Sequence, residues 1–150
     1  MRVNALHLAT RGHEVWGIDG TPTDLRMARA KAMKRGLKAT FRLADALNLG
    51  RLGKIFDTVI DSGLFHTFSD KERVRFARSL ATIIGPGGDY FSLVFSEYQT
   101  GFFGPRRVTQ AEIRSTFSDG WRVNYIREAR IEANDEPAGV RAWLSSIARL

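Results

Sequence analysis

Short apolar runs typical of strands alternate along this chain with segments that open on helix-capping residues. Strand-like runs occupy residues 13–19, 38–43, 56–61 and 90–95. Thr21-Pro22-Thr23-Asp24 is predicted to open a helix reaching about Arg35, and Ser69-Asp-Lys-Glu72 a second one. Strands and helices that alternate in units of about 30 residues indicate βαβ crossovers. The chain is therefore predicted to be an α/β protein with a doubly wound, mostly parallel sheet.

The remaining segments complete one domain. Residues 4–11 read as the end of a helix closed by Gly12, and Gly85-Pro-Gly-Gly88 reads as a turn before the 90–95 strand. Thr109 to Glu112 is a further capping box, which predicts a short helix ending near Phe117. Residues 121–128 and 140–147 read as two closing strands. Since no linker or repeat interrupts the pattern, residues 1–150 are predicted to form a single domain.

Composition excludes several classes of protein. No apolar run approaches the length of a membrane span, and the first ten residues lack the apolar core of a signal peptide. We therefore expect a cytoplasmic protein that does not enter membranes. The chain has no cysteine, and its three histidines are far apart, which argues against a disulfide scaffold, a thiol nucleophile or a zinc site. No metal ligand is predicted.

The net charge of +7 leaves two interpretations open. Basic residues are densest between Arg26 and Arg42, where only one aromatic residue, Phe41, is interleaved. Such a stretch is either a solvated helix face or a patch that binds a polyanion. The lack of further aromatic residues argues against a stacking surface for single-stranded nucleic acid.

Residues that follow the predicted strands are the candidates for function, because open α/β sheets bind ligands at the carboxyl ends of their strands. Asp19 can accept hydrogen bonds from ribose hydroxyls, or it is a turn residue of Asp-Gly. Asp45 can accept from an adenine amino group, or it is a loop residue. Asp61 can meet a cationic group, and His66 is either a base or substrate contact or a packing residue.

Four segments together resemble a class I S-adenosylmethionine-dependent methyltransferase. They are Val-Trp-Gly-Ile-Asp19, Leu-Ala-Asp45-Ala46, Phe-Asp-Thr-Val-Ile-Asp61-Ser-Gly-Leu-Phe-His66, and Ile-Gly-Pro-Gly-Gly88 before an aromatic strand. None is specific alone, but their order and spacing over most of the chain are similar to the family. The resemblance implies a Rossmann-like sheet of seven strands whose last strand is antiparallel and lies in a closing hairpin.

The resemblance also implies site residues and a cofactor, S-adenosyl-L-methionine. Asp19 and Gly20 would bind the adenosine ribose, Asp45 and Ala46 the adenine, and Asp61 and Ser62 the region of the methionine. His66 or Tyr98 would accept a proton from the methyl acceptor. Three further residues, Phe65, Phe68 and Arg106, would contact a small-molecule substrate, whose methylation proceeds by in-line displacement.

One departure from the family concerns the first strand and its glycine-rich loop. The chain begins within that segment, and Arg2 stands about where the last glycine of the loop is expected, so that its side chain would intrude on a cofactor. The absent strand would be central, lying between the Asp19 and Asp61 strands, and its absence leaves two edges unpaired. The chain is then a truncated enzyme, a sheet that closes differently or with a second copy, or a relative that no longer binds the cofactor.

The prediction is an enzyme that methylates a small molecule, with three alternatives. A nucleic-acid methyltransferase fits the net charge, but the chain lacks a base-flipping motif of the Asn/Asp-Pro-Pro-Tyr type. A methyltransferase-like binding module fits the missing loop, and an exposed sheet edge would then allow a homodimer or a partner strand. A dehydrogenase fits Asp19 equally well, but by resemblance Asp45-Ala46 and Asp61-Ser62-Gly63 fit the methyltransferase better.

Overall fold

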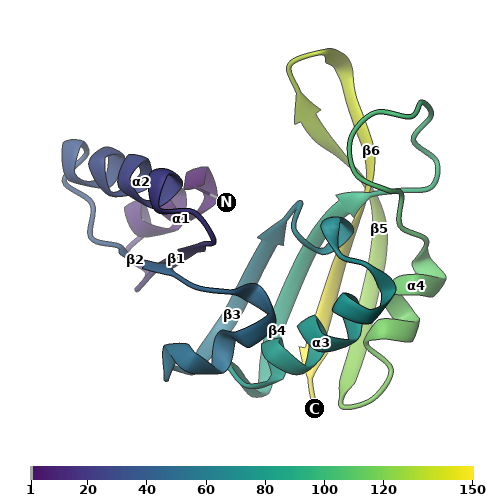
Figure 1. Ribbon diagram of the computed structural model, residues 1–150, viewed down its shortest axis with the longest axis horizontal. Helices are drawn as coiled ribbons and strands as arrows, with labels where there is room; N and C mark the ends of the chain where they lie inside the picture. The colour runs from purple at the N-terminus through teal and green to yellow at the C-terminus, as the bar shows by residue number, and fades with distance from the viewer. Residues whose placement is uncertain (1) are drawn as a thin grey trace. The chain divides into compact units, whose positions relative to one another are not determined.

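The computed structural model describes residues 2–150, with side chains from Ala5 onward. Met1 and the side chain of Arg2, expected to replace the last loop glycine, lie outside these described parts. The chain folds into two compact units, Met1–Leu52 and Gly53–Leu150, whose elements are labelled in Figure 1. No helix between residues 2 and 150 is long and apolar enough to span a membrane.

The first unit contains two helices and two parallel strands. The helices are α1 (Arg2–Thr10) and α2 (Pro22–Lys34), and the strands are β1 (Trp16–Asp19) and β2 (Thr40–Leu43). The strands pair in register from Trp16↔Thr40 to Asp19↔Leu43, so their carboxyl ends lie side by side. A 3-10 segment, η1 (Ala46–Leu52), follows.

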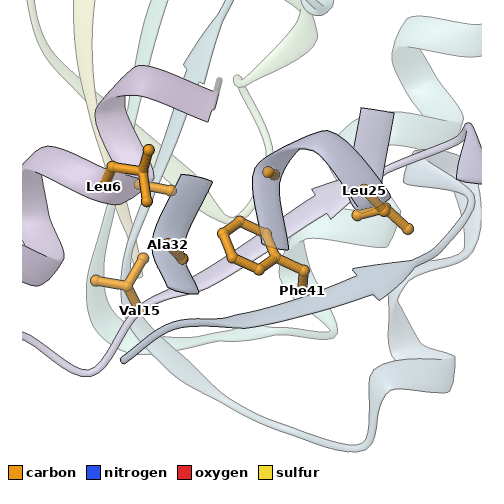
Figure 2. Close-up of a cluster of buried hydrophobic side chains, with 7 residues drawn as sticks. Leu6, Val15, Leu25, Ala32 and Phe41 are labelled. Carbon is orange, nitrogen blue, oxygen red and sulfur yellow. The ribbon is translucent and has the colours of Figure 1, made fainter. Parts of the chain in front are cut away.

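Its core is built on one face of α2, whose apolar residues are spaced three and four apart. Leu25, Ala28 and Ala32 of α2 are all buried, and Figure 2 shows this face beside Leu6, Val15 and Phe41. Gly17 is needed for this packing, since an added Cβ would lie 2.6 Å from the Phe41 ring. The predicted cap is also present, because the Thr21 side chain accepts from the Asp24 backbone N–H.

The second unit is a four-stranded mixed sheet with two packed helices. Its elements, in chain order, are β3 (Phe56–Ser62), η2 (Phe65–Thr67), α3 (Asp70–Ala81), β4 (Ile84–Phe95), α4 (Gln110–Thr116), β5 (Trp121–Ala133) and β6 (Glu136–Arg149). The strand order is β3-β4-β6-β5. β3 and β4 are parallel, whereas β6 is antiparallel to both β4 and β5. The antiparallel last strand and closing hairpin are confirmed.

Six strands are described, in two sheets, where the resemblance implied one sheet of seven. Among residues 2–150, β1 has one ladder partner, β2, and β3 has one ladder partner, β4. These are the two strands expected to flank the absent central strand, and each ends its own sheet.

The glycine-rich segment before β4 differs from its prediction. Gly85-Pro-Gly-Gly88 lies within β4, which begins at Ile84 and not at Tyr90. The pairing passes from Phe56↔Ile84 to Thr58↔Asp89, so the extra residues form a bulge. An added Cβ on Gly88 would lie 2.6 Å from the Ile84 side chain and 3.0 Å from the Asp57 carbonyl oxygen. Gly88 therefore allows a close approach inside the strand, while Gly87, at φ +85°, has the left-handed backbone typical of a turn.

The closing hairpin is longer than predicted at its turn end. Pairing of β5 with β6 continues to Ala133↔Glu136, whereas β4 reaches only Ala142 of β6. Residues 136–141 thus pair with β5 alone. The extension is a two-stranded ribbon that continues beyond the end of the β4 ladder.

The two predicted capping boxes of the second unit differ in one bond. At α3 the Ser69 and Glu72 box is complete. At α4 the Thr109 side chain accepts from the Glu112 N–H, but the Glu112 carboxylate meets Arg73 Nη1 at 2.6 Å. Arg73 is 3% exposed and its guanidinium lies 4.8 Å from the Phe65 ring centre. An ion pair between a buried arginine and a glutamate that is 38% exposed thus connects α3 to α4, which helical periodicity did not reveal.

Replacing Glu112 with Ala leaves the Arg73 charge buried without its carboxylate. We expect the free energy of unfolding to fall by about 2–3 kcal/mol, since an unpaired buried charge is strongly destabilising. The matched control is Asp70→Ala, which breaks the exposed Arg106–Asp70 pair and should cost much less. Urea unfolding measures both, and equal losses would contradict this account of the α3–α4 contact.

Candidate functional site

The carboxyl ends of β1 and β2 bring two of the predicted acids to one edge of the first unit. Asp19 ends β1 opposite Leu43, and Asp45 follows two residues after Leu43. The Asp19 carbonyl oxygen also accepts from the Ala44 backbone N–H at 3.1 Å, which holds the two segments together. The arrangement predicted for a nucleotide, one acid beyond each of two neighbouring parallel strands, is present in this unit.

The Asp19 carboxylate organises the turn into α2 through a single oxygen. Oδ1 accepts from the Thr21 backbone N–H at 2.9 Å and from the Thr21 hydroxyl at 3.2 Å. Oδ2 makes neither of these bonds, and the side chain is half-buried. Gly20 beside it has open space where a Cβ would stand. This corner therefore has an accepting oxygen and the room that a ligand hydroxyl needs.

Asp45 and Ala46 follow β2 in an exposed turn. The Asp45 Oδ1 accepts from the Leu47 backbone N–H at 2.9 Å, which starts η1. The side chain is exposed and Ala46 is half-buried. As at Asp19, one carboxylate oxygen positions the backbone while the side chain remains open to solvent.

Asp61, at the end of β3, is in a different environment. Its side chain is 3% exposed, and it accepts from Leu64 N–H at 2.8 Å, Phe65 N–H at 3.1 Å and the Tyr90 hydroxyl at 2.7 Å. Burial raises the pKa of Asp61 above its ordinary value, although these three bonds act in the opposite direction. The Asp61 carboxylate therefore holds the turn that follows β3. Ser62, the last residue of β3, is half-buried.

His66 is held by backbone groups from both neighbouring strand ends. Its Nδ1 accepts from the Phe95 N–H at 3.1 Å, and the ring also bonds to the Gly63 backbone. Burial, together with the charges of Arg73 and Arg107, lowers the pKa of His66 to about 4. The imidazole is therefore neutral near pH 7, with its Nδ1 lone pair in use.

The two predicted pocket phenylalanines lie in the core. Phe65 is 1% exposed and Phe68 is 9% exposed, and both pack against Phe76 of α3 at centroid distances of 6.3 and 4.9 Å. Such residues support a site from beneath. Their surface is taken up by neighbouring rings, so a ligand would have to displace those rings to reach it.

Arg106 and Tyr98 differ in whether their polar groups are already bonded within the protein. The Arg106 guanidinium donates to the Phe68 carbonyl oxygen at 3.0 Å and to Asp70 at 2.8 Å. Tyr98 is 49% exposed, with its ring on Trp143 at 5.3 Å and the Arg141 guanidinium 5.1 Å from its centre. Tyr98 thus presents a polar aromatic group at the surface, while Arg106 joins two segments of the protein.

A cavity of about 690 Å³ lies between α3 and α4 in the second unit. Arg73, Glu112 and Trp121 are among its lining residues, and of the predicted site residues Arg106 alone lines it. Sequence reasoning missed this groove, and it missed Tyr90 as the donor to Asp61. The alternation of β4 predicts that Tyr90 points inward, but it does not identify the carboxylate that its hydroxyl meets.

The depressed pKa of His66 predicts acid sensitivity. A group that binds its proton more weakly when folded adds stability above its unfolded pKa of about 6.5, and that stability is lost as the pH falls to about 4. His66→Gln removes this contribution. We expect the difference in unfolding free energy between wild type and His66→Gln to shrink as the pH falls through that window.

Urea unfolding at several pH values measures this difference, with the exposed His13 changed to Gln as the control. Asp61 acts with the opposite sign, because its raised pKa costs stability as the pH rises above about 3.8. It is present in both proteins and cancels in the difference. A pH-independent difference would contradict the buried, neutral state of His66.

Comparison with known proteins gives a family match over more than half of the chain. Residues 3–88 match the family described as a methyltransferase domain. The 2-heptyl-1-hydroxyquinolin-4(1H)-one methyltransferase of Mycobacteroides abscessus is 37% identical over 135 residues, which cover 88% of this chain and 60% of that protein. The demethylmenaquinone methyltransferase of Thermus thermophilus is 39% identical over 93 residues, covering 62% of this chain and 41% of that protein. The chain thus spans less than two thirds of either relative.

Solved structures support the same relationship. A structure from work on converting a disulfide bond into a thioacetal group during echinomycin biosynthesis superposes with a TM-score of 0.86 at 34% identity, covering 97% of this chain and 70% of that one. The magnesium protoporphyrin IX methyltransferase of Synechocystis, with bound S-adenosylhomocysteine, superposes at 0.76 and 20% identity over 97% of this chain and 68% of its own. The fold and the family match agree: this chain belongs to the class I S-adenosylmethionine-dependent methyltransferases.

Proposed function

We propose that this protein transfers a methyl group from S-adenosylmethionine to a small-molecule acceptor. The observation that carries the proposal is the pair of acids beyond β1 and β2, where Asp19 keeps one carboxylate oxygen unused by its own turn. Two vicinal ribose hydroxyls are the donors that such a carboxylate accepts best in nucleotide folds. Family membership gives the identity of the nucleotide.

The residues of the first unit fit the adenosine part of this cofactor. Asp19 Oδ2 would accept from the ribose, and Gly20 leaves space for the sugar to approach the backbone. Asp45 would accept from the adenine amino group, with the ring against the Ala46 methyl. Each of these roles requires that a ligand can reach the side chain, as the exposure described above for Asp19, Asp45 and Ala46 allows.

In the second unit we assign Asp61, Ser62 and His66 to positioning. Asp61 and His66 hold the turn after β3 through bonds to backbone N–H groups, and the Nδ1 of His66 would have to leave the Phe95 N–H before it could act as a base. Tyr98 remains the candidate group to receive the acceptor's proton, because the residue is exposed and its hydroxyl can pass its own proton to solvent as it accepts one. Phe65 and Phe68 support this region from the core, and the exposed Arg106 links the Phe68 carbonyl oxygen to Asp70.

Little further machinery is required for the reaction. S-adenosylmethionine supplies a methyl group already activated on a sulfonium centre. The protein needs to align the acceptor with that methyl group and to exclude water, so that the displacement is in line. This chemistry needs neither a nucleophilic triad nor a metal.

For the acceptor we propose a planar ring compound of the quinolone or quinone kind. The two curated relatives named above act on a quinolone and on a quinone, which supports this class. The hydrogen bonds of Arg106 and Arg107 also support this acceptor class, because their guanidinium groups already donate to carbonyl oxygens and to Asp70. An acidic acceptor would have to compete with these bonds.

Binding of S-adenosylhomocysteine tests the cofactor assignment. We expect calorimetric titration to show binding to the 150-residue chain. Asp19→Asn keeps an acceptor for Thr21 but loses the charge, and should weaken the affinity about tenfold, as expected for a charged hydrogen bond. Asp24→Asn is the control, since Asp24 lies in the same cap network through Thr21. Equal affinities for both variants would contradict the role of Asp19.

Methyl transfer to 2-heptyl-1-hydroxyquinolin-4(1H)-one tests the acceptor class. We expect mass spectrometry to detect the methylated product when the chain is incubated with S-adenosylmethionine, and Tyr98→Phe to slow its formation. A chain that binds S-adenosylhomocysteine but forms no product would contradict the proposed acceptor. Salt-dependent binding of transfer RNA in the same preparation would instead favour a nucleic acid acceptor.

A further inference from the structure

The segment from Glu97 to Arg107, which follows β4, is a closed loop with a fixed neck. Ser96 and Val108 form a parallel bridge, in which Val108 N–H donates to the Phe95 carbonyl oxygen at 2.9 Å and Glu97 N–H to that of Val108 at 3.2 Å. The indole N–H of Trp143 in β6 lies 2.7 Å from the Glu97 carboxylate and 3.1 Å from the Val108 carbonyl oxygen. The loop therefore begins and ends at one buried point.

A single guanidinium fills the interior of this 97–107 loop. Arg107 donates through Nε, Nη1 and Nη2 to five backbone carbonyl oxygens, at distances between 2.8 and 3.4 Å, those of Gln99, Thr100, Gly101, Phe103 and Pro105. Three of the five bonds are exposed and two are part-buried, so the guanidinium holds the loop backbone at the protein surface. One side chain supplies the donors for nearly half of the loop.

The same guanidinium lies close to two aromatic rings. Its centre is 5.2 Å from the Phe95 ring centre and 5.1 Å from that of Phe103. Gly104, at φ +71°, lets the loop approach Phe95, since an added Cβ would lie 3.1 Å from the Phe95 ring. The 97–107 loop is thus packed onto the last residue of β4.

Phe95 in turn connects the loop to the end of β3. His66 packs edge-on against the Phe95 ring at 4.9 Å and accepts from the Phe95 backbone N–H. The charge of Arg107 also contributes to the low pKa of His66. A continuous set of contacts therefore runs from the interior of the 97–107 loop to the turn after β3, at the carboxyl ends of two parallel strands.

We propose that Arg107 is the positioning residue for the methyl acceptor, since it holds the 97–107 loop in one conformation above the carboxyl ends of β3 and β4. This inference rests on the proposed function. The loop presents Tyr98 and the fully exposed Phe102 at the surface, and ligands of such sheets bind beyond the strand ends. Arg107 acts through the loop: with all its groups bonded to loop carbonyls, it positions other residues and is not itself a ligand.

Arg107→Lys tests the proposal, because lysine keeps the charge but has a single nitrogen that cannot reach five carbonyl oxygens. Hydrogen exchange of amides 98–106 should accelerate by about tenfold or more as the loop opens. The KM for 2-heptyl-1-hydroxyquinolin-4(1H)-one should rise about tenfold. We expect the affinity for S-adenosylhomocysteine to stay within about twofold of wild type, because the proposed cofactor residues lie outside the loop.

Arg106→Lys is the matched control, a neighbouring arginine whose two bonds are to Phe68 and Asp70 outside the loop. It should leave the loop amides protected. Unchanged exchange in Arg107→Lys would show that Arg107 does not order the loop. Faster exchange with an unchanged KM would show that the loop does not bind the acceptor.

Failure of the proposed function would look different. If wild type turns over no quinolone, the acceptor class is wrong, and loop exchange is then compared with and without the quinolone added. Protection of amides 98–106 by the compound in wild type, absent in Arg107→Lys, would still support the positioning role. No protection in either protein would overturn it. Unfolding in urea, followed by the fluorescence of the three tryptophans, shows whether each variant is folded.

Discussion

The parallel pairing of β3 with β4 is the constraint on which the second unit depends. It brings the turn after β3 and the loop after β4 to the same end of the sheet, in a register that runs to Ser62↔Leu93. Asp61, Tyr90 and His66 then fix that end with buried hydrogen bonds. Buried polar groups of this kind are costly unless all are satisfied, so they favour one arrangement of the turn over its alternatives.

In the first unit a shorter parallel pair plays the equivalent part. β1 and β2 carry Asp19 and Asp45 to one edge, and each carboxylate uses one oxygen to hold its own backbone. Here the acids stay accessible, whereas Asp61 is sealed. Two carboxylates at the ends of strands can therefore have different roles, one open to a ligand and the other structural. The difference depends on whether a neighbouring strand supplies a buried donor such as Tyr90.

Much of this could be predicted from the sequence, because caps and periodicity are local signals. The Thr21 and Ser69 caps, the Leu25, Ala28 and Ala32 face, and the positions of Asp19 and Asp45 depend on residues close together in the chain. Contacts between distant residues could not be predicted. Arg73 and Glu112, which form an ion pair, are 39 residues apart in the chain. The Arg107 side chain donates to carbonyl oxygens of its own loop, whereas composition alone would predict that it faces solvent.

The glycines show the same limit. Gly85-Pro-Gly-Gly88 has the composition of a turn, yet it forms a bulge within β4, where the close approach of the Asp57 carbonyl oxygen requires that Gly88 have no Cβ. The aromatic residues after β3 behave likewise. Phe65 and Phe68 have the composition of a pocket wall, but α3 covers them, since their rings pack on Phe76.

The central claim is that the strand ends of the first unit bind the adenosine of S-adenosylmethionine. Amide chemical-shift mapping on the isotope-labelled chain with S-adenosylhomocysteine tests it most directly. The account predicts shifts concentrated at residues 19–21 and 44–47, which follow β1 and β2. Shifts confined to the groove between α3 and α4, or none in a folded chain, would contradict it.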